Sequence, residues 1–104
     1  MPRRRQPRYP LSAVKAAFSD VNRLNRTMSA TEGAEELQMD EFAVVDLIAA
    51  LTADDFDKSM LSEVDLTTWQ DVYKPFARGR EFYVKFTLDG RGEFLLISFK
   101  RNDL

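Results

Sequence analysis

Residues 81–101 constrain the fold most, because they predict two β-strands joined by a tight turn. Apolar and polar residues alternate from Glu81 to Leu88, which is the period of a strand buried on one side only. Residues 89–92, Asp-Gly-Arg-Gly, are typical of a turn. A second apolar-rich run extends from Glu93 to Arg101, so we expect an antiparallel hairpin here.

The alternation also predicts which side chains of the hairpin face the core. The core-facing set is expected to be Phe82, Val84, Phe86, Leu95, Ile97 and Phe99. The opposite, open face then carries Tyr83, Lys85, Ser98 and Lys100, together with Phe94 and Leu96. A shift of one residue would bury Lys85 and Lys100, which costs free energy unless each finds a partner. Such a face suits a polyanion, although exposed sheet faces also carry these residues without any function.

The first half of the chain predicts helices. A helix over residues 12–25 would be capped by its first residue and has one apolar face. A short helix over residues 29–37 starts with a capping-box pattern and has few apolar residues, so we expect it at the surface. Asp40 can cap a third helix over residues 41–51, which is apolar nearly all round and should pack on more than one side.

Residues 56–60 and 68–76 are rich in aromatic residues and predict two further strands. Helices first and strands last predict an α+β fold, with the N-terminal helices packed on one face of an antiparallel β-sheet. A length of 104 residues suits one domain. We expect residues 11–104 to form that domain, preceded by a basic extended arm, residues 1–10.

The arm contains Arg3, Arg4, Arg5 and Arg8 between prolines, which disfavour a helix. We favour a solvated tail over a phosphate-seeking arm. Charge is segregated along the whole chain. Residues 1–26 carry seven basic groups and one acid (7 − 1 = +6), residues 27–65 one basic group and eleven acids (1 − 11 = −10), and residues 66–104 seven and five (7 − 5 = +2). The chain is therefore not a uniformly basic nucleic-acid binder, but its two ends can form a local basic surface.

Composition removes several kinds of chemistry. Cysteine and histidine are both absent, so disulfides, thiolate nucleophiles and the commonest metal ligand are excluded. Catalysis would have to use Lys, Tyr, Arg, Asp, Glu, Ser or Thr. No apolar run approaches 18 residues, so we expect no membrane span.

Four strings stand out in the second half of the chain: Asp-Phe-Asp-Lys-Ser-Met at 55–60, Thr-Thr-Trp-Gln-Asp-Val-Tyr-Lys-Pro at 67–75, Tyr-Val-Lys at 83–85 and Ile-Ser-Phe-Lys at 97–100. Together they resemble the MqsR family of bacterial type II toxins. Their order and spacing stay in register from residue 51 to residue 100, and residues 9–15 also resemble the start of the family. Only residues 22–41 match poorly.

The resemblance implies a RelE-like α+β fold with a twisted antiparallel sheet. It also implies an mRNA interferase that cleaves single-stranded RNA without a ribosome and is silenced by a cognate antitoxin. The family's catalytic set falls on Lys58, Gln70, Tyr83 and Lys100. We expect RNA contacts from Lys85, Ser98 and Arg101. No metal and no cofactor is expected, and the protein would act in the bacterial cytoplasm, monomeric when free and oligomeric with its antitoxin.

Two residues depart from the family's pattern. Asp57 stands before the first lysine, where family members often have an aromatic residue, and Leu66 stands near a position where they often have histidine. A carboxylate beside Lys58 would repel phosphate unless it points away. Without histidine, the base for the RNA 2′-OH and the acid for the leaving oxygen would come from Lys58, Lys100 and Tyr83. Two alternatives remain: a non-catalytic module that binds a partner through the acidic middle, and a ribosome-dependent nuclease.

Overall fold

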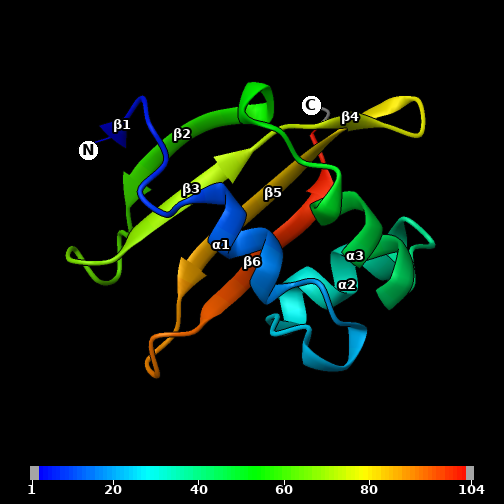
Figure 1. The fold of residues 1–104 in the computed structure, drawn as a ribbon, viewed down its shortest axis with the longest axis horizontal. Helices are drawn as coiled ribbons and strands as arrows, with labels where there is room; N and C mark the ends of the chain where they lie inside the picture. Colours follow the sequence, from blue (N-terminus) through cyan, green and yellow to red (C-terminus); the bar gives the residue numbers. More distant parts are fainter. Residues whose placement is uncertain (1–2, 103–104) are drawn as a thin grey trace.

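The structure is a computed structural model that describes residues 3–102. In chain order its elements are β1 (Arg3–Arg4), α1 (Leu11–Ala17), η1 (Val21–Arg23), α2 (Met28–Glu36), α3 (Glu41–Ala49), η2 (Ala53–Asp55), β2 (Phe56–Leu61), β3 (Trp69–Tyr73), β4 (Phe76–Ala77), β5 (Arg80–Leu88) and β6 (Phe94–Arg101), as Figure 1 shows. Helices precede the main strands, and every strand pairing is antiparallel. The predicted α+β class is confirmed.

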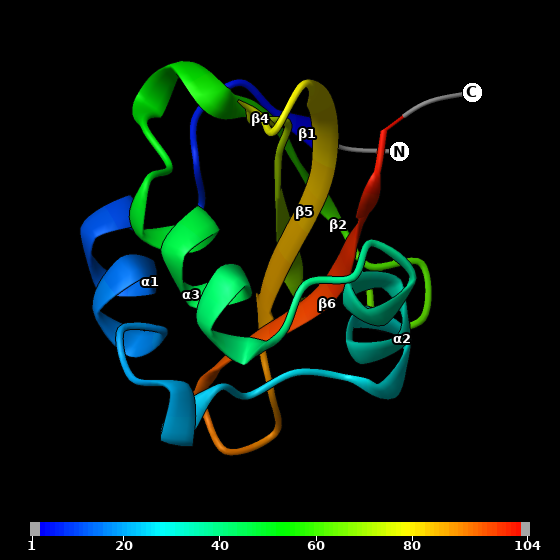
Figure 2. The ribbon, with the colours of Figure 1, turned by 90° about the vertical axis from the view of Figure 1, so that its right-hand side faces the viewer.

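The sheet is ordered β1-β2-β3-β5, and β6 pairs with the other side of β5. β4 continues the β3 side and pairs with the first residues of β5. Helices α1 and α3 cover one face of the sheet, whereas α2 lies beside β6 towards the other face (Figure 2). We call the face that α1 and α3 do not cover the open face.

The core lies between the sheet and the helices α1 and α3. Its largest fully buried side chains include Phe18 and Ile48 from the helical half and Tyr73, Phe86 and Phe99 from the strands. The ring centroids of Phe18 and Phe86 are 5.4 Å apart, which ties the end of α1 to the centre of β5. This apolar layer packs one face of the sheet against the helices and leaves the other face uncovered by α1 and α3.

The first helix is shorter than predicted. It begins after Pro10, whose backbone carbonyl accepts from the N–H groups of Ala13 and Val14, so Ser12 is inside the helix and not its cap. The helix ends at Ala17 because the next polar side chains bond to local backbone. The Ser19 hydroxyl donates to the Ala16 carbonyl, and the Asp20 carboxylate accepts from the N–H of residue 22, which starts η1.

Helix α2 also differs from its prediction. Thr27, not Ser29, is its N-cap, and the Thr27 hydroxyl accepts from the Ala30 N–H at 3.1 Å. The helix lies at the surface as predicted, with most of its side chains exposed, but one side of it packs closely on β6. A Cβ at Gly33 would overlap the backbone carbonyl oxygen of Phe99. Only a glycine allows the helix backbone to approach the strand so closely. The Asp40 cap of α3 is confirmed.

The predicted faces of β6 are only partly right. Lys85 pairs with Ser98 but the next residue, Phe86, pairs with Leu96, so a β-bulge leaves Ile97 without a direct partner. The bulge reverses the alternation on its N-terminal side. Leu96 is therefore fully buried in the core, and the core cluster does not contain Leu95 or Ile97.

Phe94 also lies on the opposite face from the one predicted, for the same reason. Its ring packs edge-on against the buried Tyr9 ring, with centroids 5.5 Å apart, on the helix side of the sheet. On the C-terminal side of the bulge the prediction holds, because Phe99 is buried and Ser98 and Lys100 pair with Lys85 and Tyr83.

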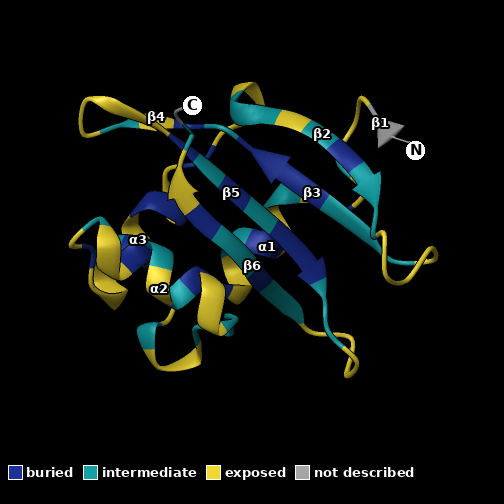
Figure 3. Ribbon diagram, turned by 180° about the vertical axis from the view of Figure 1, so that it is seen from behind, coloured by how far each residue is buried: buried dark blue, intermediate teal, exposed yellow. Residues whose placement is uncertain are grey.

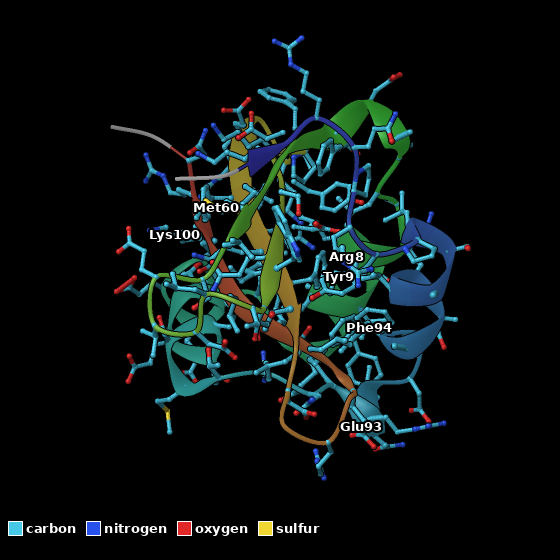
Figure 4. All side chains as sticks on the ribbon, turned by 90° about the vertical axis from the view of Figure 1, so that its left-hand side faces the viewer. Arg8, Tyr9, Met60, Glu93, Phe94 and Lys100 are labelled. Atoms are coloured by element: carbon cyan, nitrogen blue, oxygen red, sulfur yellow. The ribbon has the colours of Figure 1, made fainter. Side chains whose placement is uncertain are left out.

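The N-terminal arm is not a solvated tail over the residues described. β1 pairs with β2, and the backbone N–H groups of Arg8 and Tyr9 donate to the two carboxylate oxygens of Asp71 at 3.0 and 2.9 Å. Tyr9 is buried, and its hydroxyl donates to the Trp69 carbonyl at 2.8 Å. Figure 4 shows Arg8 and Tyr9 on the helix side, away from Lys100. Residues 1–2 of the predicted arm and residues 103–104 of the predicted domain lie outside the described residues.

Candidate active site

One row of paired residues crosses the open face from β2 to β6. Lys58 is in register with Val72, Val72 with Lys85, and Lys85 with Ser98. Side chains of directly paired residues point to the same face of a sheet. Val72 is fully buried yet lies outside the core cluster, so it forms the floor of the row between the two lysines.

Three further predicted residues join this face. Tyr83 is in register with Lys100 in the neighbouring row, and Gln70 lies two residues before Val72 on the same strand, so the period of two puts it on the same side. We call the set the open-face site; its members are Lys58, Gln70, Tyr83, Lys85, Ser98 and Lys100. Figure 3 shows these strands from the open side, with α2 flanking β6.

Arg101 is the one predicted site residue that the fold does not bring onto the open face. It is in register with Phe82, whose side chain is in the core, so Arg101 alternates away from the open face.

The Tyr83 ring organises two of the lysines. The ammonium nitrogen of Lys100 lies 5.2 Å from the ring centroid, and that of Lys85 lies 5.9 Å from it. An ammonium within about 6 Å of an aromatic ring is attracted to the electron-rich face. The ring therefore holds two positive groups near each other that would otherwise repel.

The site shifts the protonation of its own residues. Burial lowers the pKa of the Lys85 ammonium below its ordinary 10.5, and the charges of Lys100 and Lys58 lower it further, while Glu63 opposes the change. Burial raises the pKa of the Tyr83 hydroxyl above 10.0, and the negative charge of Asp57 adds to the rise. Lys85 therefore gives up its proton more readily than a free lysine, and Tyr83 keeps its own at neutral pH.

Comparison with known proteins assigns the chain to a family. The family model described as motility quorum-sensing regulator, toxin of MqsA, matches residues 6–101. This chain belongs to the MqsR toxin family. It is 36% identical over 97 residues to the mRNA interferase toxin MqsR of Escherichia coli (strain K12), and the match covers 93% of this chain and 96% of that protein. The predicted membership is confirmed.

Asp57, the first departure from the MqsR pattern, forms an ion pair with a neighbouring lysine. A β-bulge between Phe56 and Lys58 takes Asp57 out of the regular pairing of β2. Its carboxylate forms an ion pair with the Lys74 ammonium, with 3.4 Å between oxygen and nitrogen. The pair reduces the repulsion that this carboxylate would exert on a phosphate near Lys58.

Leu66, the second departure, lies in the loop between β2 and β3. The Asp65 carboxylate accepts from the hydroxyls of Thr67 and Thr68 at 2.6 Å each, and these hydrogen bonds lower its pKa to about 2. The loop is thus well organised and exposes Leu66 and Val64 to solvent. The negative charge of Glu63, in the same loop, opposes the fall in the pKa of Lys85, so the loop lies near the open-face site.

Sequence reasoning missed Glu63 and the residues of α2, because neither lies in a string that carries the MqsR resemblance. Within residues 3–102, no group of three or more His, Cys, Asp or Glu side chains is arranged to hold a metal ion. In the same range no helix has the length and apolar character to cross a membrane.

Proposed function

We propose that this protein is the toxin of a type II toxin–antitoxin pair and acts as an endoribonuclease on single-stranded mRNA. The observation that carries the proposal is the open-face site, with Lys58 and Lys85 in one row of the sheet and Lys85 and Lys100 beside the Tyr83 ring. The relative named mRNA interferase toxin supports the same activity. The family description, toxin of MqsA, supports a cognate antitoxin as partner.

The site has the chemistry that a ribonucleotide requires. Lysine ammonium groups neutralise phosphate as point charges, and a tyrosine ring offers a face on which an unpaired base can stack. Gln70 and Ser98 add neutral hydrogen-bonding groups for phosphate or ribose oxygens. We infer that Lys58 and Lys100 hold the scissile phosphate and its added negative charge in the transition state.

The reaction needs a base and an acid but no metal ion. The RNA 2′-oxygen forms a bond to the adjacent phosphorus, and the bond from phosphorus to the 5′-oxygen breaks. The products are a 2′,3′-cyclic phosphate and a free 5′-OH. Lys85, with its lowered pKa, is the proposed acceptor of the 2′-OH proton. Tyr83, which retains its proton, is the proposed donor to the leaving 5′-oxygen.

Incubation of the purified protein with a defined single-stranded RNA in EDTA tests the proposal, with the Lys100→Ala variant alongside. The expected result is cleavage by the unmodified protein, with cyclic-phosphate and 5′-OH ends, and far slower cleavage by the Lys100→Ala variant. No cleavage by either protein, with both folded, would favour a ribosome-dependent or purely binding role. Metal-dependent cleavage would refute the assigned chemistry.

We further propose that the protein acts in the bacterial cytoplasm, where its mRNA substrate is found, and that it is monomeric until the antitoxin binds. Light scattering of the free protein and of its complex measures the oligomeric state directly. A stable dimer of the free protein would contradict it.

A further inference from the structure

A small cavity lies between α2 and the end of β6 that carries the open-face site. Its volume is about 190 Å³. Ser29, Glu32 and Glu36 of α2 line one side, and Ser98 and Lys100 of β6 line the other. The cavity therefore shares two residues with the open-face site. A group bound to Lys100 would lie next to this cavity.

Helix α2 is a fixed wall of this cavity. The Gly33 backbone lies against the Phe99 carbonyl, and Ala30 of the same helix is fully buried. Just before the helix, the Thr27 N–H donates to the Leu96 carbonyl at 3.0 Å, and the Leu96 N–H donates in turn to Asn25 at 3.0 Å. The helix cannot slide along β6 without breaking these bonds, so the cavity is largely formed before any ligand binds.

The charges on the two sides of the cavity differ. Glu32 and Glu36 are one helical turn apart and line the α2 side of the cavity, whereas Lys100 lines the β6 side. An ionised carboxylate only accepts hydrogen bonds, so this wall repels a phosphate and attracts N–H donors. The hydroxyls of Ser29 and Ser98 can either donate or accept. The cavity therefore suits a neutral planar group that carries amino hydrogens and is attached to a phosphate held by Lys100.

We propose that this cavity binds a nucleobase next to the scissile phosphate, and that Glu32 and Glu36 accept hydrogen bonds from its amino group. Unpaired bases in single-stranded RNA are read on these edges. Guanine, cytosine and adenine each present an amino group, whereas uracil presents one N–H between two carbonyl oxygens that the carboxylates disfavour. The protein then cleaves poorly where uracil occupies this position. The inference rests on the proposed ribonuclease function.

The location of these glutamates in the sequence favours a preference particular to this chain. Both lie outside the four strings that carry the MqsR resemblance. The residues that would perform the chemistry lie within those strings. Catalysis and base preference would thus reside on different parts of the chain, β-strands for the first and α2 for the second.

The test compares RNAs that differ only in the base on either side of the cleaved bond. The enzymes are the unmodified protein, the double variant Glu32→Gln/Glu36→Gln, and the control Glu35→Gln. Glu35 is exposed on the same helix but does not line the cavity. We expect the unmodified protein and the control to disfavour uracil on one side of the bond by about tenfold or more in kcat/KM. The double variant should lose this discrimination, because glutamine can also donate to the carbonyls of uracil.

Loss of negative charge beside Lys100 would by itself change the cleavage of all the RNAs by the same factor. A uniform change, or unaltered discrimination in the double variant, would overturn the base-binding proposal and leave the ribonuclease function standing. The same RNAs with a 2′-deoxy residue at the cleaved position cannot react, and their affinities are measured in parallel. If the protein cleaves nothing, the ribonuclease proposal fails, and equal affinity for all four bases would refute the cavity's role separately.

Discussion

Replacement of Lys85 by arginine separates the role of its proton from that of its charge. Arginine keeps the positive charge in the row between Val72 and Ser98, but it stays protonated at any working pH. If Lys85 only held phosphate, Lys85→Arg would keep most of the activity. If Lys85 accepts the 2′-OH proton, we expect kcat to fall by about 10²- to 10⁴-fold with little change in KM.

The pH dependence gives a second, independent measure. A general base works only when deprotonated, so kcat/KM should rise with pH up to the pKa of Lys85, which lies below 10.5. Lys100 is one of the two charges that lower this pKa. Lys100→Ala should therefore raise the pKa of Lys85 and shift the rising limb of the pH profile to higher pH, in addition to slowing the reaction.

The assay is cleavage of a fluorescent single-stranded RNA across a range of pH, with saturating and limiting substrate. Circular dichroism checks that each variant is folded. A Lys85→Arg enzyme with near-normal kcat would refute the assignment of the base. So would a pH profile that Lys100→Ala leaves in place.

Three further substitutions test the fold around the site. Gly33→Ala should destabilise the protein by about 1–3 kcal/mol in chemical denaturation, since the new Cβ would overlap the Phe99 carbonyl and push α2 away; an unchanged midpoint would contradict the close packing. Asp71→Asn should lower the free energy of unfolding by about 1–3 kcal/mol and increase hydrogen exchange at residues 8 and 9, because asparagine offers only one oxygen to the two backbone N–H groups. The exposed control Asp46→Asn should change neither quantity. Tyr73→Phe should leave stability unchanged or slightly higher, since the buried hydroxyl has no hydrogen-bond partner among the described residues. Burial raises the pKa of this hydroxyl to about 12, so between pH 10 and 12 the unfolded chain loses the proton first and the unmodified protein should lose stability. The variant should lose less stability over the same pH range.

The alternation of polar and apolar residues was sufficient to predict four of the six members of the open-face site. Tyr83, Lys85, Ser98 and Lys100 lie on one hairpin, where the face of each side chain depends only on its position along a strand. The same reasoning failed for Leu96, because a bulge at Ile97 reverses the alternation and nothing in an apolar run marks which residue is the extra one.

The other two members of the site depend on pairings between distant strands. Lys58 and Gln70 reach the open face through the register of β2 with β3 and of β3 with β5, which is fixed by packing and not by local sequence. Only the family resemblance pointed to them. The close packing of helix α2 was missed for a related reason. Few apolar residues predicted a surface helix, and most of its side chains are exposed. Its contact with β6 is made by Gly33 and two buried alanines, Ala30 and Ala34, which pack closely because they are small.

The two margins of the sheet have a consequence for how the protein behaves at high concentration. An uncovered margin of a β-sheet presents free N–H and C=O groups to which a strand of a second molecule can add. Here β1 pairs along part of β2 at one margin, and the segment before α2 bonds to Leu96 at the other. The chain thus covers part of both margins with its own residues. At those positions two copies cannot join strand to strand, which favours a toxin that remains dispersed until its antitoxin is bound.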